Sequence, residues 1–512
     1  MARKFYSGLL KMGLDKHFLK YFLLIVFILS FCTQCATAEN KTKVRKPMVA
    51  GGFYPADPTE LKSVIDQFLE NSKIHSISGQ VQAIIAPHAG YIYSGHVAAE
   101  GYAILKGKDI KRVVVISPTH IEAFRGAAIY DGDAYETPLG IIPVDKEFSD
   151  QLSKKNNLLI LSSKGHETKR MGRGEHALEV QLPFLQRSLG DFKLVPIIMG
   201  DQEYETCRAL GLALADLIQD DKTLIIASSD LSHFHSYDEA KRLDSKVTSS
   251  VQEWDYFNLH RNLQSGLCEA CGGGPIISAM IATESNGANE ARLLKYANSG
   301  DIPNGDKSRV VGYASIALIK SNDKTDKNEK PFSLSKKEQQ QLIQIARDAV
   351  EYRIKEGDVF KLDKSYEANL LQDRAAFVTL KINHQLRGCI GYTSPISPLC
   401  QTVRDAAIQA ATQDPRFRPV KEDELKLLTY EISVLSPFRR VLDTDKIEVG
   451  RHGLLIKKGE YVGLLLPQVP VGQNWDRQTF IEQTCRKAGL TIDAWKDTNT
   501  DIFSFTAFVF GE

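Results

Sequence analysis

Three side chains that commonly bind transition metals stand in short motifs of the first half of the chain. They are His88 in Ala-Pro-His-Ala-Gly-Tyr, His120 in Ser-Pro-Thr-His, and Cys271 in Glu-Ala-Cys-Gly-Gly-Gly-Pro. Each motif is expected to end a β-like run or to form a tight loop. Two imidazoles and one thiolate can hold one redox-active metal ion and leave coordination positions open. A fourth motif of this kind, Ser-Ser-Asp-Leu-Ser-His, contains Asp230 and His233.

Short continuous apolar runs predict the strands that must position these motifs, because such runs suit strands buried on both faces. They are residues 84–86, 113–116, 194–198 and 224–227. Helix-like stretches alternate with several of these runs. They are residues 96–105, 177–189 and 204–218. This alternation predicts an α/β fold with a mixed, largely parallel sheet flanked by helices. Because ligands bind beyond the carboxyl ends of parallel strands, we expect His88, His120 and His233 to converge there.

The composition describes a globular protein, with 43% apolar and 25% charged residues. At 512 residues the chain is too long for one ordinary domain. Residues 321–330 are polar and charged without an apolar period, which predicts a linker. Residues 309–320 before it read as an apolar strand. After it, Ser335 and Glu338 have the spacing of a capping box, which predicts a helix that runs to about Arg353.

The N-terminal residues have the pattern of a secretory signal peptide. Residues 1–20 carry five Lys or Arg and one Asp, residues 21–31 are apolar and uncharged, and residues 36–38 read Ala-Thr-Ala. We therefore expect residues 1–38 to be removed and the mature chain to be exported, either periplasmic or extracellular. The apolar run is shorter than the roughly 20 residues of a membrane span. The alternative is an uncleaved segment that anchors the chain in a membrane.

Charge and cysteine usage restrict the class of partner and site. The formal charge is +1 for the whole chain and about −3 without residues 1–38, and no zinc-finger or RNP-like pattern occurs, so nucleic acid is not an expected partner. Export implies an oxidising compartment. There Cys268 and Cys271, spaced as C-x-x-C, could form a disulfide or redox pair instead of supplying a ligand. We expect Cys271 to stay a thiolate ligand that is not joined to Cys268.

Taken together, these motifs resemble the Memo family, protein B of the three-part AmmeMemoRadiSam set. The resemblance covers residues 45–320 and rests on seven stretches. They are Val-Ala-Gly-Gly-Phe-Tyr-Pro from Val49, Ala-Pro-His-Ala-Gly-Tyr-Ile-Tyr-Ser-Gly from Ala86, Ser-Pro-Thr-His from Ser117, Glu-Thr-Pro-Leu-Gly from Glu136, Glu-His-Ala-Leu-Glu from Glu175, Ser-Ser-Asp-Leu-Ser-His from Ser228 and Cys-Gly from Cys271. The family's fold is similar to that of class III extradiol dioxygenases, which use non-haem Fe(II).

The resemblance implies a metal site made of His88, His120 and Cys271, with the cysteine in the place of the carboxylate of the dioxygenase triad. Fe(II) is the preferred metal by fold analogy, and copper is the alternative, because a thiolate favours such metals over magnesium. A trigonal blue-copper centre uses the same three ligand types. Its usual axial methionine is missing near Cys271, since the next Met is Met280.

The resemblance also implies residues that would act beside the metal. His233 and Asp230 are the expected catalytic pair, with His233 either orienting a ligand or acting as general acid or base at an ordinary pKa of about 6.5. Asp230 would either fix the tautomer of His233 or cap the following turn. Glu175 and His176 are expected behind the metal ligands or in the cleft.

Residues 333–512 resemble a second family, the AMMECR-type domain, which is protein A of the same set. Its signature here is Leu-Arg-Gly-Cys-Ile-Gly from Leu386, with five supporting stretches. They are Asp-Pro-Arg-Phe from Asp414, Glu-Ile-Ser-Val-Leu from Glu431, Gly-Arg-His-Gly-Leu from Gly450, Leu-Leu-Pro-Gln-Val from Leu465 and Asn-Trp-Asp from Asn474. The resemblance implies an α+β fold but no reaction, because the family's activity is not established.

The local pattern around this signature predicts a β-hairpin with its turn at residues 383–385. Side chains alternate along a strand, so Arg387 and Cys389 should share one face. A guanidinium beside a thiol would lower the thiol pKa and favour the thiolate. Gly388 and Gly391 would let other groups approach the strand closely.

These expectations combine into one hypothesis about the domain organisation and function of the chain. The chain would comprise a signal peptide (1–38), a Memo-like domain (45–320), a linker (321–332) and an AMMECR-type domain (333–512). It would be an exported component of an AmmeMemoRadiSam-type system, with an iron-dependent, dioxygenase-like redox module that acts on a small molecule or peptide. The chain lacks a C-x-x-x-C-x-x-C cluster, so radical chemistry would belong to a radical-SAM partner. The alternatives are a non-enzymatic scaffold with a degenerate dioxygenase-like cleft and a copper or iron chaperone.

Overall fold

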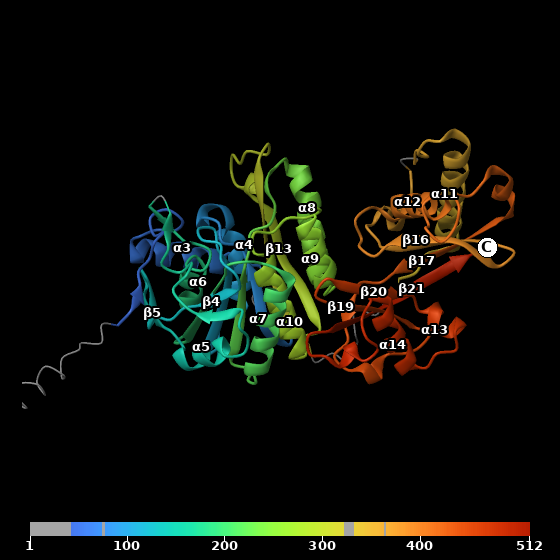
Figure 1. The fold of residues 1–512 in the computed structure, drawn as a ribbon. Helices are drawn as coiled ribbons and strands as arrows, with labels where there is room; N and C mark the ends of the chain where they lie inside the picture. The colour runs from blue at the N-terminus through green and yellow to red at the C-terminus, as the bar shows by residue number, and fades with distance from the viewer. Residues whose placement is uncertain (1–41, 74–76, 171, 322–331, 363–364) are drawn as a thin grey trace, which may run out of the picture. The chain divides into compact units, whose positions relative to one another are not determined.

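The computed structural model of the chain describes residues 42–73, 77–170, 172–321, 332–362 and 365–512 (Figure 1). The expected signal peptide (1–38) and nearly all of the expected linker (321–332) lie outside the described residues. Within those ranges, no helix is both long enough and apolar enough to cross a membrane.

The first half of the chain is built on a nine-stranded mixed sheet with the order β12-β14-β2-β11-β3-β10-β4-β7, and β13 pairs with β14. Its strands are β2 (Gln80–Ala86), β3 (Arg112–Pro118), β4 (Ala127–Ile129), β7 (Leu159–Leu161), β10 (Lys193–Met199), β11 (Thr223–Ser228), β12 (His233–His235), β13 (Glu290–Asn298) and β14 (Val310–Lys320). The neighbours β2, β11, β3 and β10 are parallel. β14 and β4 run antiparallel to β2 and β10. The centre of the sheet is therefore parallel, and the expected apolar runs form its four central strands.

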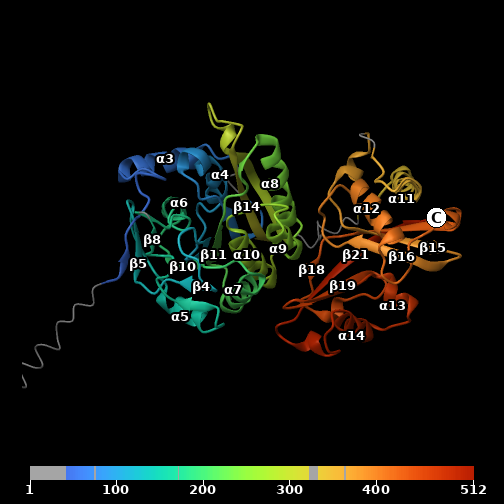
Figure 2. The ribbon, with the colours of Figure 1, turned by 45° about the horizontal axis from the view of Figure 1, so that its top comes forward.

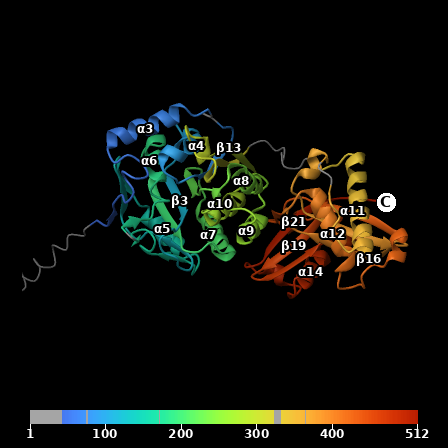
Figure 3. The same ribbon diagram turned by 90° about the horizontal axis from the view of Figure 1, so that it is seen from above.

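Helices cover both faces of this sheet (Figure 3). One face carries α3 (Pro58–Glu70), α4 (Tyr91–Ala103) and α6 (Gln181–Ser188), and the other carries α7 (Tyr204–Leu217) and α10 (Gly273–Ser285). The described residues of this half also form α5 (Lys146–Ser153), α8 (Tyr237–Gln252) and α9 (Tyr256–Gln264). Alternate residues of β3 enter the two cores, Val113 and Val115 on the first face and Val114 and Ile116 on the second. Burial on both faces is why the strand is a continuous apolar run.

Two of the three expected helices start at other residues than predicted. α4 begins at Tyr91, ahead of the expected residue 96, because the Gly90 turn is fixed by a hydrogen bond from the Tyr91 amide to the Phe53 carbonyl. α6 begins at Gln181 and not at residue 177. Pro183 lies in its first turn, the part of a helix that tolerates proline.

The second half contains an antiparallel sheet with the order β16-β15-β17-β21-β19-β20, and β18 pairs with β21. Its strands are β15 (Ala376–Ile382), β16 (Gln385–Tyr392), β17 (Leu428–Leu435), β18 (Arg439–Arg440), β19 (His452–Lys458), β20 (Tyr461–Leu465) and β21 (Asp501–Gly511). α11 (Lys336–Glu356) and α12 (Leu399–Thr412) cover one face of β15 and β17 (Figure 1 and Figure 2). α14 (Arg477–Lys487) packs on β19 and β20 (Figure 1). α13 (Gln468–Gly472) follows β20. Helices packed on an antiparallel sheet make this half an α+β fold.

The capping box expected at the start of α11 is present. Ser335 Oγ accepts a hydrogen bond of 3.2 Å from the Glu338 amide, and Glu338 Oε2 accepts one of 2.7 Å from the Ser335 amide. The helix runs beyond the expected Arg353 and ends at Gly357, whose φ of 74° suits glycine. The second-half fold therefore begins at a helix whose first turn is held by its own side chains.

Replacing Ser335 with Ala should loosen α11, because the Glu338 amide loses its acceptor. A lost N-cap weakens a helix by about 1 kcal/mol, which corresponds to roughly fivefold faster amide exchange. Hydrogen exchange followed by mass spectrometry on the full chain measures this effect in α11 peptides. Ser333→Ala is the control, since Ser333 is exposed and lies outside the helix. Equal exchange in the two variants would contradict the cap.

Candidate metal centre

Two parallel strands and one helix start position the three residues expected to bind metal. His88 and His120 each stand two residues beyond a parallel strand, after β2 and β3. Cys271 does not end a strand; it lies in the tight turn before α10, whose N-cap is Gly272, which is the second of the two expected arrangements. A Cβ on Gly272 would stand 2.1 Å from the Ser228 carbonyl oxygen. Glycine therefore lets this turn approach the end of β11, and this approach carries Cys271 to the histidines.

The structure brings His88, His120 and Cys271 together. One ligand atom from each lies within 4.8 Å of those of the other two. His88 Nε2 is 3.0 Å from Cys271 Sγ, and the His88 and His120 ring centroids are 5.2 Å apart. His88 is almost fully buried, whereas about a third of the His120 side chain is exposed. The cluster is thus reached by solvent from the side of His120.

Hydrogen bonds define which nitrogen of His88 is free. Ser228 Oγ donates its only proton to the Ala177 carbonyl at 2.7 Å and accepts from Gln181 Nε2 at 2.7 Å. His88 Nδ1, 2.9 Å from the same hydroxyl oxygen, must therefore be a donor. Burial and the neighbouring His120 hold the pKa of His88 well below its usual value, so the ring is neutral. Its Nε2 lone pair then points toward Cys271 Sγ.

Glu175 fixes the tautomer of the His120 ring, as Ser228 fixes that of His88. Its carboxylate accepts hydrogen bonds from His120 Nδ1 at 3.0 Å, from the His120 amide at 2.5 Å, and from the His176 and Ala177 amides at 2.9 and 3.0 Å. Burial alone would raise the pKa of Glu175, but the hydrogen bonds from His120 and the nearby imidazoles outweigh it and lower the pKa to about 2. An ionised carboxylate only accepts hydrogen bonds, so His120 Nδ1 must be the donor. Its Nε2 then carries a lone pair that can bind a metal ion.

Asp230 and His233, the expected catalytic pair, make separate contacts. Asp230 Oδ1 accepts hydrogen bonds from the His88 amide at 2.8 Å and the Ala89 amide at 3.3 Å. The Asp230 amide donates to Cys271 Sγ at 3.2 Å. His233 Nδ1 contacts the Leu231 carbonyl at 2.8 Å, so this carbonyl sets its tautomer and the expected bond from Asp230 is not formed. His233 pairs with Val311 at the start of β14, and β14 runs antiparallel to β2, so His233 lies at the same end of the sheet as His88.

Burial controls the charge of the thiols. It raises the pKa of Cys271 well above the ordinary range, and the negative Asp230 raises it further, so the thiol is protonated when no cation is nearby. Burial likewise raises the pKa of Cys268 to about 12. All six cysteines of the described residues are free thiols, so Cys268 and Cys271 are not joined.

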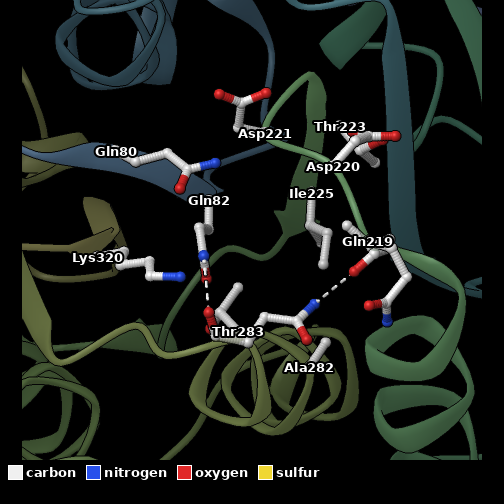
Figure 4. A pocket seen from close by; sticks show the side chains of 12 residues that line it. Gln80, Gln82, Gln219, Asp220, Asp221, Thr223, Ile225, Ala282, Thr283 and Lys320 are labelled. Carbon is white, nitrogen blue, oxygen red and sulfur yellow. Dashed lines mark hydrogen bonds between the residues drawn. The ribbon is translucent and has the colours of Figure 1, made fainter.

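A cavity of about 570 Å³ lies at the opposite, amino-terminal edge of the central strands. Figure 4 shows Gln80, Gln82 and Lys320 on one side of it and Gln219 and Asp220 on the other. The Asp220 carboxylate is already occupied by the Lys222 amide, the Thr223 hydroxyl and Arg112. Within the described residues, the two groups of three side chains that could hold a metal ion both lie at the other end of the sheet from this cavity.

Comparison with known proteins agrees with this geometry. The family model of the Memo-like protein matches residues 45–317, more than half of the chain. The chain belongs to the Memo family. A MEMO1 family protein of Methanosarcina mazei is 39% identical over 279 residues, covering 54% of this chain and 99% of the relative. One from Methanopyrus kandleri is 36% identical over 285 residues, covering 54% and 98%.

The AMMECR1 family model matches residues 343–510, so the chain joins a Memo-like half to an AMMECR1-like half. The resemblance to both families expected from the motifs is thereby confirmed. Among solved structures, the chain is similar to an uncharacterised protein from Pyrococcus horikoshii, with 41% identity and a TM-score of 0.35. That match covers 35% of this chain and 94% of the other.

The signature of the AMMECR1-like half lies on the hairpin that the motif predicted. β15 and β16 are joined by Asn383 and His384, with φ values of 50° and 66°. A bulge at Arg387 interrupts the pairing, since Leu380 pairs with Gly388 and Lys381 with Leu386. Strict alternation therefore does not apply at Arg387, contrary to expectation.

The bulge changes the neighbours of Cys389. The Arg387 guanidinium donates hydrogen bonds to Glu424 Oε1 at 2.8 Å and to the Arg418 carbonyl at 2.9 Å. It is the Arg416 guanidinium that contacts Cys389, by donating to the Cys389 backbone carbonyl at 3.2 Å. Burial raises the pKa of Cys389, while Thr379 and Arg416 only partly oppose this. The expectation of a thiolate activated by Arg387 is therefore wrong.

Alkylation of Cys389 by iodoacetamide, followed by peptide mass spectrometry across pH, should show a midpoint above the roughly 8.5 of a free cysteine. A raised pKa leaves less thiolate at any given pH, which slows the reaction. Arg416→Ala should move the midpoint further upward, because a positive charge near the thiol is lost. Arg387→Ala is the matched control and should leave the midpoint in place. A shift with Arg387→Ala alone would contradict the contacts described above.

Proposed function

We propose that the Memo-like half of this chain is a mononuclear metal-dependent oxidoreductase module with His88, His120 and Cys271 as metal ligands. The observation that carries the proposal is the convergence of three donor atoms within 4.8 Å of one another. They lie at the carboxyl ends of central parallel strands, where sheets of this kind bind their ligands.

The donor set fits a transition-metal ion. Three atoms that are each about 2.0–2.3 Å from one ion lie about 3–4 Å apart. His88 Nε2 and Cys271 Sγ are already 3.0 Å apart, and small side-chain movements would close the set around an ion. The Nδ1 atoms of both histidines are held by Ser228 and Glu175, a usual arrangement for metal-binding imidazoles. A cation would also favour the Cys271 thiolate, which burial otherwise disfavours.

The chemistry of the ligands favours iron, copper or zinc over magnesium. We propose Fe(II), because the fold of the Memo family is similar to that of class III extradiol dioxygenases, and copper is the second choice. When bound, such an ion would supply a redox-active Lewis acid with positions open to a substrate. The substrate would be a small molecule or a peptide.

Around such an ion, the chain's own residues would have distinct roles. His233 has Nδ1 fixed by the Leu231 carbonyl, which leaves Nε2 available to give or take a proton from a substrate. Asp230 would act through position, because its carboxylate holds the His88 loop and its amide contacts Cys271 Sγ. Glu175 would hold His120 in the orientation and tautomer that a metal ligand requires.

We also propose that the mature chain is exported and acts with a radical-SAM protein of the same system. Export is supported by the basic, apolar and small-residue pattern of residues 1–38. The radical-SAM partner is supported by the presence of a Memo-like and an AMMECR1-like half in one chain.

Metal analysis of the full mature chain, purified without oxygen, should find about one iron per molecule. His88→Ala, His120→Ala and Cys271→Ala should each reduce the metal content sharply, since two remaining ligands no longer define a site. Cys268→Ala is the matched control, because this buried thiol lies three residues away and outside the cluster. Unchanged metal in Cys271→Ala, or an equal loss in Cys268→Ala, would overturn the ligand assignment. Oxygen-dependent turnover by the iron-loaded protein would separate an enzyme from a scaffold or chaperone.

N-terminal sequencing of the protein isolated from its native cell should give Glu39 as the first residue. The expected cleavage follows the Ala-Thr-Ala of residues 36–38. Cell fractionation of the same sample should place the mature chain outside the cytoplasm. A chain that begins at Met1 and sediments with the membrane would support the anchored alternative instead.

A further inference from the structure

His176 is a third imidazole beside the candidate metal ligands. Its ring centroid lies 4.6 Å from that of His120 and 5.4 Å from that of His88. Phe53 covers it at a centroid distance of 4.5 Å and an interplanar angle of 34°. The ring is thus packed between Phe53 and His120 and meets His88 edge to face, at 88°. This packing fixes its orientation without any bond to its nitrogens.

The hydrogen bonding of His176 differs from that of its neighbours. His88 Nδ1 is bonded to Ser228 and His120 Nδ1 to Glu175. The His176 ring forms no hydrogen bond within the described residues, and its nearest carboxylate atom, Glu175 Oε1, is 3.5 Å from Nδ1. About a fifth of the side chain is exposed. An oriented imidazole with unused polar atoms at a partly open site is suited to a ligand that comes from outside the chain.

A second metal position does not explain His176. One ligand atom each from His120, Glu175 and His176 also lies within 4.8 Å of the others. However, both Glu175 oxygens already accept hydrogen bonds, from the His120 ring and from the amides of His120, His176 and Ala177. Oε1 already accepts three of these bonds, and His120 Nδ1 already donates one of them, so an ion placed there would compete with them. Glu175 is therefore an anchor for His120, and His176 is the imidazole of this cluster whose ring nitrogens make no hydrogen bond within the described residues.

We propose that His176 is a positioning residue that donates a hydrogen bond to a ligand of the metal that does not come from the protein. This ligand would be a small anionic group, such as a carboxylate or phenolate of the substrate. This proposal rests on the proposed function, because it requires an ion held by His88, His120 and Cys271. Three protein ligands leave a position for such a group. His176 lies against two of them, and its side chain is partly exposed, as is that of His120.

The test uses the full mature chain loaded with Co(II), whose visible spectrum reports changes at the metal, and azide as the anionic probe. His176→Ala should weaken azide binding by about tenfold or more, the loss expected for one hydrogen bond to a charged acceptor. Its cobalt content and azide-free spectrum should match those of the wild type. His176→Gln, which keeps a donor, should bind azide within about threefold of the wild type. His96→Ala is the control, because His96 is on α4 and outside the cluster.

Each other outcome has a definite meaning. Equal azide affinity in His176→Ala and the wild type would overturn the role of His176 alone. A loss of cobalt as large as that in His88→Ala would also overturn it, because His176 would then be a protein ligand. A wild-type chain that binds neither cobalt nor iron would overturn the proposed function itself.

Discussion

β11 lies between β2 and β3 in the first sheet, and all three strands run in the same direction. Their buried side chains hold the register, with Ser228 opposite Ala86. The loops that follow the strands therefore start side by side at one edge of the sheet, and His88 Nδ1 lies within hydrogen-bond distance of the Ser228 hydroxyl. A slip of one residue would turn the apolar side chains of a strand to the opposite faces and remove this contact. The whole candidate site depends on this parallel pairing.

The Ser-Ser-Asp sequence at the end of β11 acts as a scaffold for the site. Ser228 orients the His88 ring, and the Ser229 hydroxyl accepts a hydrogen bond of 3.0 Å from the Gly272 amide. Asp230 holds the backbone of the His88 loop and contacts the Cys271 sulfur. Three consecutive side chains thus connect β2, β11 and the start of α10. Since these groups are buried and bonded, the position of Cys271 relative to His88 is set before any ligand binds.

In the AMMECR1-like half, the signature motif has a structural explanation. β16 is the edge strand of its sheet, and Asp414 accepts a hydrogen bond from the Cys389 amide while Arg416 donates to the Cys389 carbonyl. These two side chains satisfy the outward backbone groups that an edge strand leaves free. A Cβ on Gly388 would stand 2.1 Å from the Ala410 carbonyl oxygen, so glycine is needed for α12 to pack. The geometry of the motif follows from packing, and it requires no activated thiol at Cys389.

The sequence by itself determined the parallel centre of the first sheet, the convergence of His88 and His120, and the capping box of α11. These features follow from continuous apolar runs, strand direction and local spacing, all of which are written in neighbouring residues. Only the tertiary structure decided that Cys271 arrives from a helix start, that Glu175 anchors His120, and which guanidinium lies beside Cys389. These depend on contacts between segments far apart in the chain and, at Cys389, on a one-residue bulge. No local pattern encodes them, because they arise only when packed elements bring distant backbone groups together.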